Sequence, residues 1–590
     1  MNKNFPALLA GWLFVVALSV SAQSGSVRRF PADKAIGVNP DTHLVLTFPS
    51  VPTLGKSGQI RIYDAQTDKL VDTLDLSIPP GPTAGAGGPA APYTPVPYEY
   101  ASGRFTNANR APGTPTGGAV PTSPNYQLTI IGGFTDAFHF YPVIIHDNVA
   151  TIYPHNNLLE HLKTYYVQID TGALTLADGS FKGISGKDWT FTTKRNPPPA
   201  NSARLVVSGD GTGDFNTVQG AIDFVPDRNP RRVTIFIRNG NYEEIVYFRN
   251  KTNVTFLGED RDKVVVFYAN NEVFNPHPSN ISTNEWPGTF PSRRAAFMGD
   301  NSSDIHLVNF SIRNTTRGQA EGLLMMGERN IVSHVTVVGS GDALQINGPV
   351  YLTDSLIVGD GDTILGRGPG FFNRTELQSN GVFMWIRNTA ANHGNVFLNS
   401  TFRKRGTGTT EIARAPINNG RAYPNAEAVL INCVLEGISP VGWGAMGGDT
   451  SNMHYWEYNS TNASDGKPVD VSQRKPESRQ LVMPKDAEVI ANYSDPAYVL
   501  GWSPAMAPLF LEHPEGVTAA TGQSATLAVK VAAIPEATYQ WLKNGTPVAG
   551  ATQGIFTLNS VKASDAARYT VTVANASGRA TSDAAVLTVK

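Results

Sequence analysis

The sequence predicts an all-β protein in which a right-handed parallel β-helix is flanked by two β-sandwich domains. Glycine and proline are frequent (56 and 41 of 590 residues) and only 16% of residues are charged, as in turn-rich β proteins. The middle of the chain holds a loose repeat of short apolar runs, and strand-like runs between turn residues lie on either side. A chain of this length is expected to form about three domains.

The first 22 residues predict an export signal. Lys3 precedes an apolar stretch, and small residues lead to Ala22, after which cleavage is expected. The apolar stretch is short for a membrane span, so we expect a secreted or periplasmic protein with no membrane partner after cleavage. Cys433 is the only cysteine, which excludes an intramolecular disulfide bond. The net charge of −2, with scattered Lys and Arg, argues against a nucleic-acid partner, and we expect a monomer.

Residues 24–195 predict a first β domain. Four strand-like runs lie between turn signals: "THLVLTFPS", "GQIRIYDAQ", "TYYVQID" and "KDWTFTTK". A stretch rich in Pro, Gly and Ala, from Ile78 to Pro124, interrupts them and predicts a flexible insertion. The final "FTT" resembles the end of bacterial Ig-like modules, so we expect a β-sandwich, followed by a linker over 196–201.

Residues 508–590 predict a second β-sandwich. "ATYQWLKNG" supplies a strand with Trp541, and "SDAARYTVTVANASG" places Tyr569 at the spacing of a tyrosine corner. The segment resembles an Ig-like domain. Val529 and Val571 stand where such domains carry cysteines, so Trp541 is expected to pack in the core without a disulfide bond.

Residues 202–505 contain short apolar runs, each with one polar residue inside: "LVNFSI", "VSHVTV", "LTDSLI", "FNRTEL", "FLNSTF" and "LINCVL". Aligning the runs brings six residues into register at intervals of 25, 20, 20, 25 and 33: Asn309, His334, Asp354, Arg374, Asn399 and Asn432. A repeat of about twenty residues with short strands and no helical period is typical of a stacked solenoid, most simply a right-handed parallel β-helix. A β-propeller is the alternative, but its repeat is about twice as long.

Two aspartates recur within this repeat. "VGSGDALQINGP" contains Asp342 and "VGDGDTILGRGP" contains Asp362, each eight residues after the aligned polar residue of its coil. Successive coils lie about 4.8 Å apart, so we expect the two carboxylates to be neighbours on one face. Two carboxylates that close do not both ionise cheaply, so one keeps its proton while the other stays charged, which pairs an acid with a nucleophile. A solvated aspartate ladder, or a calcium site that includes Asp360, fits this spacing equally well.

An ordered series of motifs extends over residues 204–505: "VVSGDGTGDFNTVQGAIDFVP", "GNYEE", "GQAEGLL", "GDALQ", "GDTILG", "ARAP" and "VGWG". In this order and at these spacings the series resembles the pectin methylesterases, carbohydrate esterase family 8. The resemblance implies a right-handed parallel β-helix that hydrolyses the methyl esters of galacturonate units in pectin (homogalacturonan) and releases methanol. It also implies that no metal and no other cofactor is needed.

The resemblance implies roles for five residues. Asp362 matches the family's nucleophile, which attacks the ester carbonyl, and Asp342 matches the general acid/base, which protonates methanol and then activates water. Gln319 matches a glutamine that hydrogen-bonds the tetrahedral oxyanion. Arg414 matches the arginine that pairs with the nucleophile and keeps it ionised. Trp443 matches an aromatic side chain of the sugar subsite, and Gln319 and Arg414 are expected to contact substrate as well.

The sequence departs from the family pattern near these residues. The glutamine that usually precedes the acid/base is replaced by Gly341, so one oxyanion donor is missing. Gln345 follows, but its odd offset along a strand predicts that it points to the other face and does not substitute. The tryptophan usually found two residues after the arginine is Pro416. These departures predict an altered rate or substrate rather than an inactive protein.

Three classes of function therefore compete. The first is a pectin methylesterase or a close carbohydrate esterase. The second is a β-helix glycosidase or lyase, because carboxylates about 5 Å apart also suit a retaining glycosidase. Against it, the chain lacks the "NTD", "DD" and "GHG" series of polygalacturonases and a dense acidic calcium site. The third is a non-catalytic protein that only holds polysaccharide.

Overall fold

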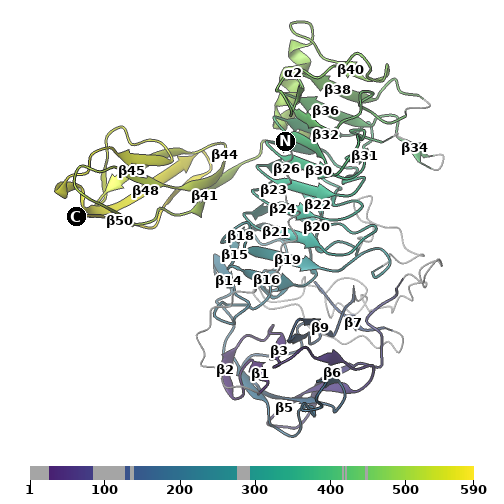
Figure 1. The fold of residues 1–590 in the computed structure, drawn as a ribbon, viewed down its shortest axis with the longest axis vertical. Helices are drawn as coiled ribbons and strands as arrows, with labels where there is room; N and C mark the ends of the chain where they lie inside the picture. Colours follow the sequence, from purple (N-terminus) through teal and green to yellow (C-terminus); the bar gives the residue numbers. More distant parts are fainter. Residues whose placement is uncertain are drawn as a thin grey trace, which may run out of the picture.

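The computed structural model describes residues 26–83, 126–132, 138–275, 293–414, 417–418, 421–445 and 449–590. A parallel β-helix runs along the long axis, one sandwich lies at its N-terminal end and a second projects from its side (Figure 1). The predicted all-β fold with a central β-helix is confirmed. The predicted export signal and most of the predicted insertion lie outside the described residues. Within those residues, no helix is long and apolar enough to cross a membrane.

The β-helix has three faces of parallel strands, here called A, B and C. The long strand β20 (Phe297–Val308) belongs to both A and B, because it bends from one face into the other. The other strands of face A are β17 (Val246–Arg249), β22 (Leu323–Glu328), β25 (Leu344–Ile346), β28 (Ile364–Gly366) and β31 (Met384–Ile386). Those of face B are β14 (Arg204–Val207), β15 (Val233–Ile237), β18 (Thr252–Gly258), β23 (Asn330–Ser333), β26 (Val350–Thr353), β29 (Gly370–Asn373), β32 (Asn395–Leu398), β36 (Glu427–Ile431), β38 (His454–Tyr458) and β40 (Arg479–Gln480). Face C comprises β16 (Gly240–Glu243), β19 (Val264–Tyr268), β21 (Ser311–Asn314), β24 (Thr336–Val338), β27 (Leu356–Gly359), β30 (Glu376–Ser379), β33 (Thr401–Lys404), β37 (Val434–Glu436) and β39 (Thr461–Asn462).

The interior of the β-helix is built from rows of apolar side chains, one from each coil. On face A, Leu323, Leu344, Ile364 and Met384 stack in register and are fully buried. Burying such a side chain stabilises the fold by about 1.5–3 kcal/mol. Because neighbouring positions on a strand point to opposite faces, a slip of one residue would turn this row outward. The rows therefore fix the register of the coils.

The predicted alignment of polar residues is confirmed. Each residue follows a strand of face B at the turn into face C. Its backbone N–H donates to a carbonyl at the end of the neighbouring strand on the next coil, as His334 does to Thr353. All six have a positive φ between 50° and 62°: Asn309, His334, Asp354, Arg374, Asn399 and Asn432. Asn and Asp tolerate this conformation better than most residues.

Helix α1 (Val218–Phe224) lies at the N-terminal end of the β-helix and is buried along its whole length. Its first two amides donate to Glu244 at 2.8 and 2.9 Å. Asp41 of the N-terminal domain accepts from the amides of the two residues before the helix. The Tyr242 hydroxyl donates to the Arg238 carbonyl at 2.7 Å. Tyr242 and Glu244 of the "GNYEE" motif therefore make contacts within the β-helix and with its first helix.

The N-terminal domain is a sandwich of two sheets around one apolar core. One sheet holds β1 (Arg28–Phe30), β3 (Leu44–Thr47), β10 (Val149–Ile152) and β9 (Val143–His146). The other holds β2 (Ala35–Val38), β13 (Thr190–Thr193), β11 (Thr164–Ile169), β5 (Gln59–Asp64) and β6 (Leu70–Asp75). Two small pairs are β4 (Thr53–Leu54) with β12 (Leu174–Thr175) and β7 (Leu128–Thr129) with β8 (Phe138–His139). All four predicted strand runs are strands here: β3, β5, β11 and β13.

The C-terminal domain is a second sandwich. Its strands are β41 (Met506–Glu512), β42 (Val517–Ala519), β43 (Ala525–Ala528), β44 (Lys530–Ile534), β45 (Thr538–Lys543), β46 (Thr546–Pro547), β47 (Ile555–Leu558), β48 (Ala567–Asn575), β49 (Gly578–Thr581) and β50 (Ala585–Val589). Trp541 is fully buried opposite Val571, and the Tyr569 hydroxyl donates to the Asp565 carbonyl at 3.0 Å. The predicted core tryptophan and tyrosine corner are therefore present.

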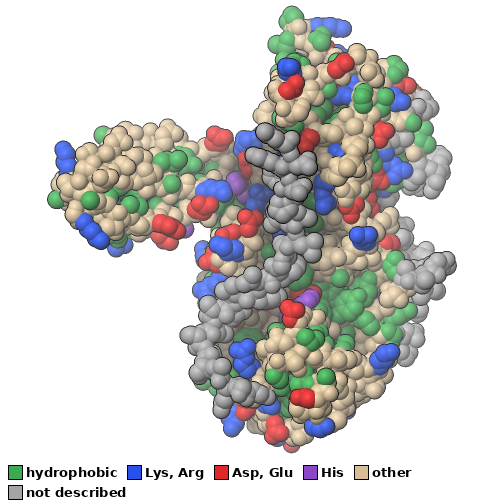
Figure 2. Space-filling model, viewed as in Figure 1, with side chains coloured by type: hydrophobic (Ala, Val, Ile, Leu, Met, Phe, Trp, Pro, Cys, Tyr) green, Lys and Arg blue, Asp and Glu red, His purple; other side chains and the backbone are tan. Residues whose placement is uncertain are grey.

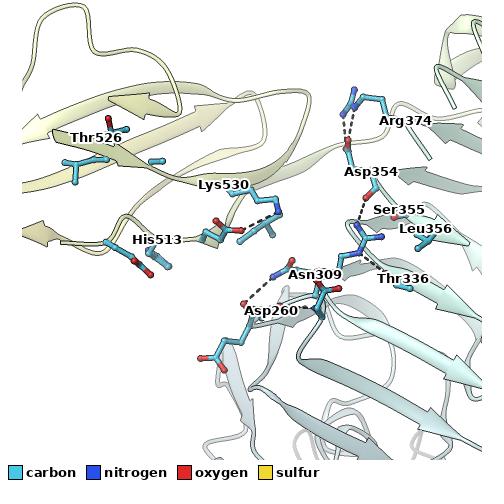
Figure 3. A pocket seen from close by; sticks show the side chains of 18 of the residues that line it. Asp260, Asn309, Thr336, Asp354, Ser355, Leu356, Arg374, His513, Thr526 and Lys530 are labelled. Carbon is cyan, nitrogen blue, oxygen red and sulfur yellow. Dashed lines mark hydrogen bonds and ion pairs between the residues drawn. The ribbon is translucent and has the colours of Figure 1, made fainter. Parts of the chain in front are cut away.

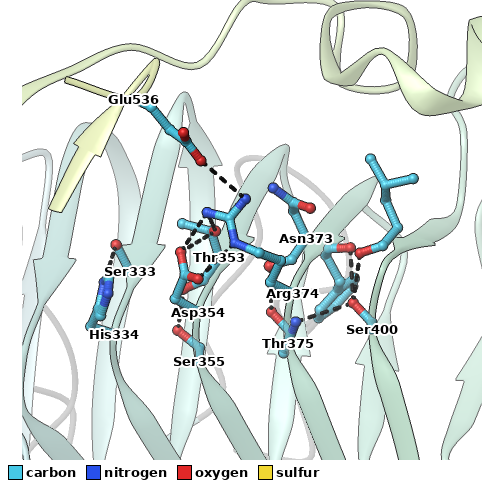
Figure 4. Close-up of polar contacts among 12 residues, drawn as sticks. Ser333, His334, Thr353, Asp354, Ser355, Asn373, Arg374, Thr375, Ser400 and Glu536 are labelled. Atoms are coloured by element: carbon cyan, nitrogen blue, oxygen red, sulfur yellow. Dashed lines mark hydrogen bonds and ion pairs between the residues drawn. The ribbon is translucent and has the colours of Figure 1, made fainter. Parts of the chain in front are cut away.

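Two contacts fasten this domain to face B. Helices α2 (Ala487–Ser494) and α3 (Pro496–Leu500) and strand β41 share an apolar cluster with Tyr351 and Phe371. Arg374 of the aligned row pairs with Asp354 on the coil before it and reaches Glu536 of the C-terminal domain at 3.8 Å (Figure 4).

A polar crevice of about 1150 Å³ lies between the β-helix and the C-terminal domain, beside these contacts (Figures 2 and 3). Two ion pairs join residues of its lining, Arg374 with Asp354 and Lys530 with Glu512. Neither Asp342 nor Asp362 lines it.

Candidate active site

Asp342 and Asp362 occupy the same place on successive coils, as predicted. Each lies in the turn from face C to face A, two residues before strands β25 and β28, whose first residues pair in register. The amide of Asp342 donates to the Gly361 carbonyl at 3.3 Å. Both aspartates have positive φ, 62° and 43°, a conformation uncommon for a side-chain-bearing residue and often found at functional sites.

Asp362 is paired with Arg414. The Arg414 Nη1 donates to Asp362 Oδ2 at 2.7 Å, and the two side chains are 35% and 21% exposed. A charge-assisted contact of this kind favours the ionised carboxylate. Asp362 Oδ1 has no hydrogen-bond partner among the described residues. An ionised, partly accessible carboxylate has the properties that a nucleophile needs.

Asp342 has the opposite environment. It is only 5% exposed, and burial raises the pKa of its carboxyl to about 6, with Arg294 acting against the rise and Asp362 adding to it. A carboxyl with this pKa holds a proton in mildly acidic solution and can still release it. Asp342 thus has the properties of an acid, next to the arginine-paired Asp362.

Gln319 lies on the coil before Asp342. It forms a β-bridge with Gly341, which in turn bridges Gly361, so the three residues stack beside the aspartates. Gln319 is exposed, and its side-chain amide makes no hydrogen bond within the described part of the chain. The amide is therefore available to an incoming group.

Gly341 is not in the left-handed region, in contrast to Asp342 beside it. A Cβ built on it would lie 3.0 Å from the Gly318 carbonyl oxygen, with nothing else nearer than 3.6 Å. A side chain at this position would thus be tight against one atom and would project next to Gln319.

The structure contradicts the prediction that Trp443 lines a sugar subsite. Its side chain has no exposed surface and stacks on Tyr455, with ring centroids 4.8 Å apart, inside the β-helix core. The aromatic ring beside the site is that of Trp385, which is partly exposed and lies 4.7 Å from the Arg414 guanidinium carbon. Trp385 was missed, although it follows Leu365 by one twenty-residue repeat.

Gln345 points away from the β-helix interior, as the row Gln345, Leu365, Trp385 shows. It is 2% exposed, and its Oε1 has no hydrogen-bond partner in the described ranges. The alternation of side chains along β25 does not extend to Asp342, because Asp342 precedes this strand. That Gln345 does not replace the missing glutamine stays a prediction.

Comparison with known proteins identifies the domain that holds this site. The family model described as Pectinesterase matches residues 204–488, and the model described as Immunoglobulin domain matches residues 508–575. Residues 204–488 form a pectinesterase-family domain. The Ig-like resemblance of the C-terminal domain is confirmed, whereas that of the N-terminal sandwich stays a prediction, as do the domain boundaries.

The relatives of this pectinesterase-family domain include plant and bacterial proteins. A probable pectinesterase/pectinesterase inhibitor of Arabidopsis thaliana is 28% identical over 276 residues, which is 43% of this chain and 49% of that protein. A pectinesterase of Ralstonia solanacearum is 25% identical over 359 residues, 50% of this chain and 90% of that protein. The chain spans about half the length of the first relatives it matches. A solved pectin methylesterase from carrot is 18% identical with a TM-score of 0.42, covering 52% of this chain and 95% of that one.

The burial of Trp443 yields a prediction about stability. Trp443→Ala should lower the free energy of unfolding of the β-helix by about 3–5 kcal/mol, because it leaves a large cavity. Trp385→Ala, at a partly exposed position, should cost clearly less. Calorimetric melting of both variants measures the difference. An equal or larger loss for Trp385→Ala would contradict the assignment of Trp443 to the core.

Proposed function

We propose that the protein hydrolyses the methyl esters of galacturonate units in pectin, with Asp362 as nucleophile and Asp342 as general acid/base. The stacked aspartates in different environments, within a pectinesterase-family domain, are the observation that supports this most. The burial of Asp342 and the greater exposure of the arginine-paired Asp362 support this order of the two roles rather than the reverse.

In the first half-reaction, a carboxylate oxygen of Asp362 attacks the ester carbonyl carbon and forms a tetrahedral intermediate. The intermediate collapses when its bond to the methoxy oxygen breaks, and Asp342 gives its proton to the departing methanol. The product is an acyl-enzyme in which Asp362 is joined to the galacturonate carbonyl.

In the second half-reaction, the ionised Asp342 takes a proton from water, and the resulting hydroxide attacks the acyl carbonyl. The bond to Asp362 breaks, Asp362 returns as a carboxylate, and Asp342 is protonated again. One ester and one water thus give one galacturonate carboxyl and one methanol.

Gln319 is the oxyanion donor in this proposal. Its free amide stands on the coil beside Asp342, and one such donor contributes about 3 kcal/mol to lowering the barrier. Arg414 would hold Asp362 ionised and contact the substrate, and Trp385 takes the place at the site that the sequence assigned to Trp443. Export through residues 1–22 and a monomeric state remain predictions.

Two assays separate this function from its competitors. Methanol release from highly methylated pectin supports an esterase. Shortening of demethylated polygalacturonate without methanol would instead support a glycosidase or lyase, and binding without either product would support a binding protein.

Asp362→Asn should abolish methanol release while leaving the melting temperature nearly unchanged, because amide and carboxylate are almost isosteric. Asp360→Asn is the matched control, since Asp360 lies two residues away and bonds Asn380 and Ser340 rather than Arg414. It should retain most of the activity. Near-normal turnover by Asp362→Asn would refute the nucleophile assignment.

Gly341→Gln should raise kcat by up to about tenfold with little change in KM, because a second donor beside Gln319 would act mainly in the transition state. Backbone strain is not expected, since Gly341 lacks a positive φ, but the Gly318 carbonyl must shift slightly. Kinetics and thermal melting are measured together. A stable variant without a rate gain would mean that the oxyanion already has a second donor.

A further inference from the structure

A third acidic residue extends the pair of aspartates into a column. Glu321 lies two residues before β22, as Asp342 and Asp362 lie two residues before β25 and β28, and the first residues of these strands pair in register. Glu321 is therefore stacked one coil before Asp342. Its side chain is fully buried, and its Oε2 has no hydrogen-bond partner among the residues that the structure describes.

Arg294 contacts two members of this column, Glu321 and Asp342. The Arg294 Nε donates to Glu321 Oε1 at 2.7 Å, and its Nη2 donates to Asp342 Oδ2 at 3.2 Å. Its Nη1 also reaches Glu272 at 3.4 Å. The Arg294 side chain is only 11% exposed, so these contacts are poorly screened by water. Arg294 thus stands to Asp342 as Arg414 stands to Asp362.

The charges in this cluster do not balance if every carboxyl is ionised. Arg294 contacts both Glu321 and Asp342, and ionising two buried carboxyls that share one contacting cation is costly. Consistent with this, burial raises the pKa of Glu321 to about 7. The cluster therefore retains a proton in mildly acidic solution, next to the carboxyl that must give one up.

We propose that Arg294, anchored by Glu321, is a positioning residue for Asp342. It holds the Asp342 carboxyl in place and lowers the cost of its ionised form, so that one group acts first as acid and then as base. This rests on the function proposed above. Without the guanidinium, burial and the neighbouring carboxylates would keep Asp342 protonated, and it would be a poor base for the second half-reaction.

Other charges also face Asp342 and must be included in any account of its titration: Arg294, Asp362, Arg387 and Arg414. Glu321, on the coil before Asp342, is also ionisable, and burial raises its pKa to about 7. Arg387 and Arg414 come from the opposite side of the column to Arg294, after β31. Removing Arg294 alone therefore leaves the Asp362 side of the site intact.

The test is the pH dependence of kcat/KM for methanol release by the full chain. Its alkaline limb reports loss of the proton from Asp342 in the free enzyme. Arg294→Met removes a nearby cation, raises the pKa of Asp342 and should move that limb to higher pH by about one unit or more. Arg294→Lys keeps the charge and should hold the limb near its wild-type position while lowering kcat.

Two further variants make the result specific. Glu321→Gln keeps an oxygen acceptor for Arg294 and resembles the protonated Glu321 present where Asp342 titrates, so the limb should stay near its wild-type position. Arg329→Met is the matched control, because Arg329 pairs with Asp304 and Glu328 away from the site, and its limb should not move. A purely structural role of Arg294 would lower activity at every pH without shifting the limb, and an unshifted limb in Arg294→Met overturns the proposal.

A second readout does not depend on activity. In protein labelled with ¹³C at the aspartate carboxyl carbons, the signal lost in Asp342→Asn identifies Asp342, and its titration is followed in wild type and Arg294→Met. A higher pKa in Arg294→Met supports the proposal, and an unchanged one overturns it. Absence of methanol release by wild type would instead refute the proposed function, so the two failures are distinguishable.

Discussion

The register of the stacked coils is the constraint on which the rest of the structure depends. Rows of buried aliphatic side chains such as Leu323, Leu344 and Ile364 fix that register from inside. Because parallel strands are about 4.8 Å apart, residues at equivalent positions in successive coils become neighbours whatever their chemistry. The core thereby forces Glu321, Asp342 and Asp362 together, against their mutual repulsion.

Two arginines offset the repulsion within this column of acidic residues, and their environments differ. Arg414 contacts Asp362 where both side chains are partly exposed. Arg294 contacts Asp342 and Glu321 in a more buried place and must divide its charge between them. The difference in burial raises the pKa of Asp342 and places a potential acid next to the arginine-paired Asp362.

Much of the architecture could be predicted from the sequence because it is encoded locally. The turn residues with positive φ, from Asn309 to Asn432, mark each coil in the sequence and gave the correct register. The same register could have revealed Glu321, one coil before Asp342, and Trp385, two coils after Gln345. Arg294 left no such signal, because its contact to Asp342 spans 48 residues. Trp443 was misplaced because a motif fixes a residue's position along the chain but not whether its ring faces the core or the solvent.

The central claim is that Asp362 becomes covalently attached to the substrate while Asp342 only transfers protons. Hydroxylamine added during turnover of methylated pectin attacks an acyl-enzyme of this kind and can leave the attached carboxyl as a hydroxamate, which tandem mass spectrometry of the digested protein locates. The account predicts modification at Asp362, dependent on substrate. Substrate-dependent modification at Asp342 instead would contradict it.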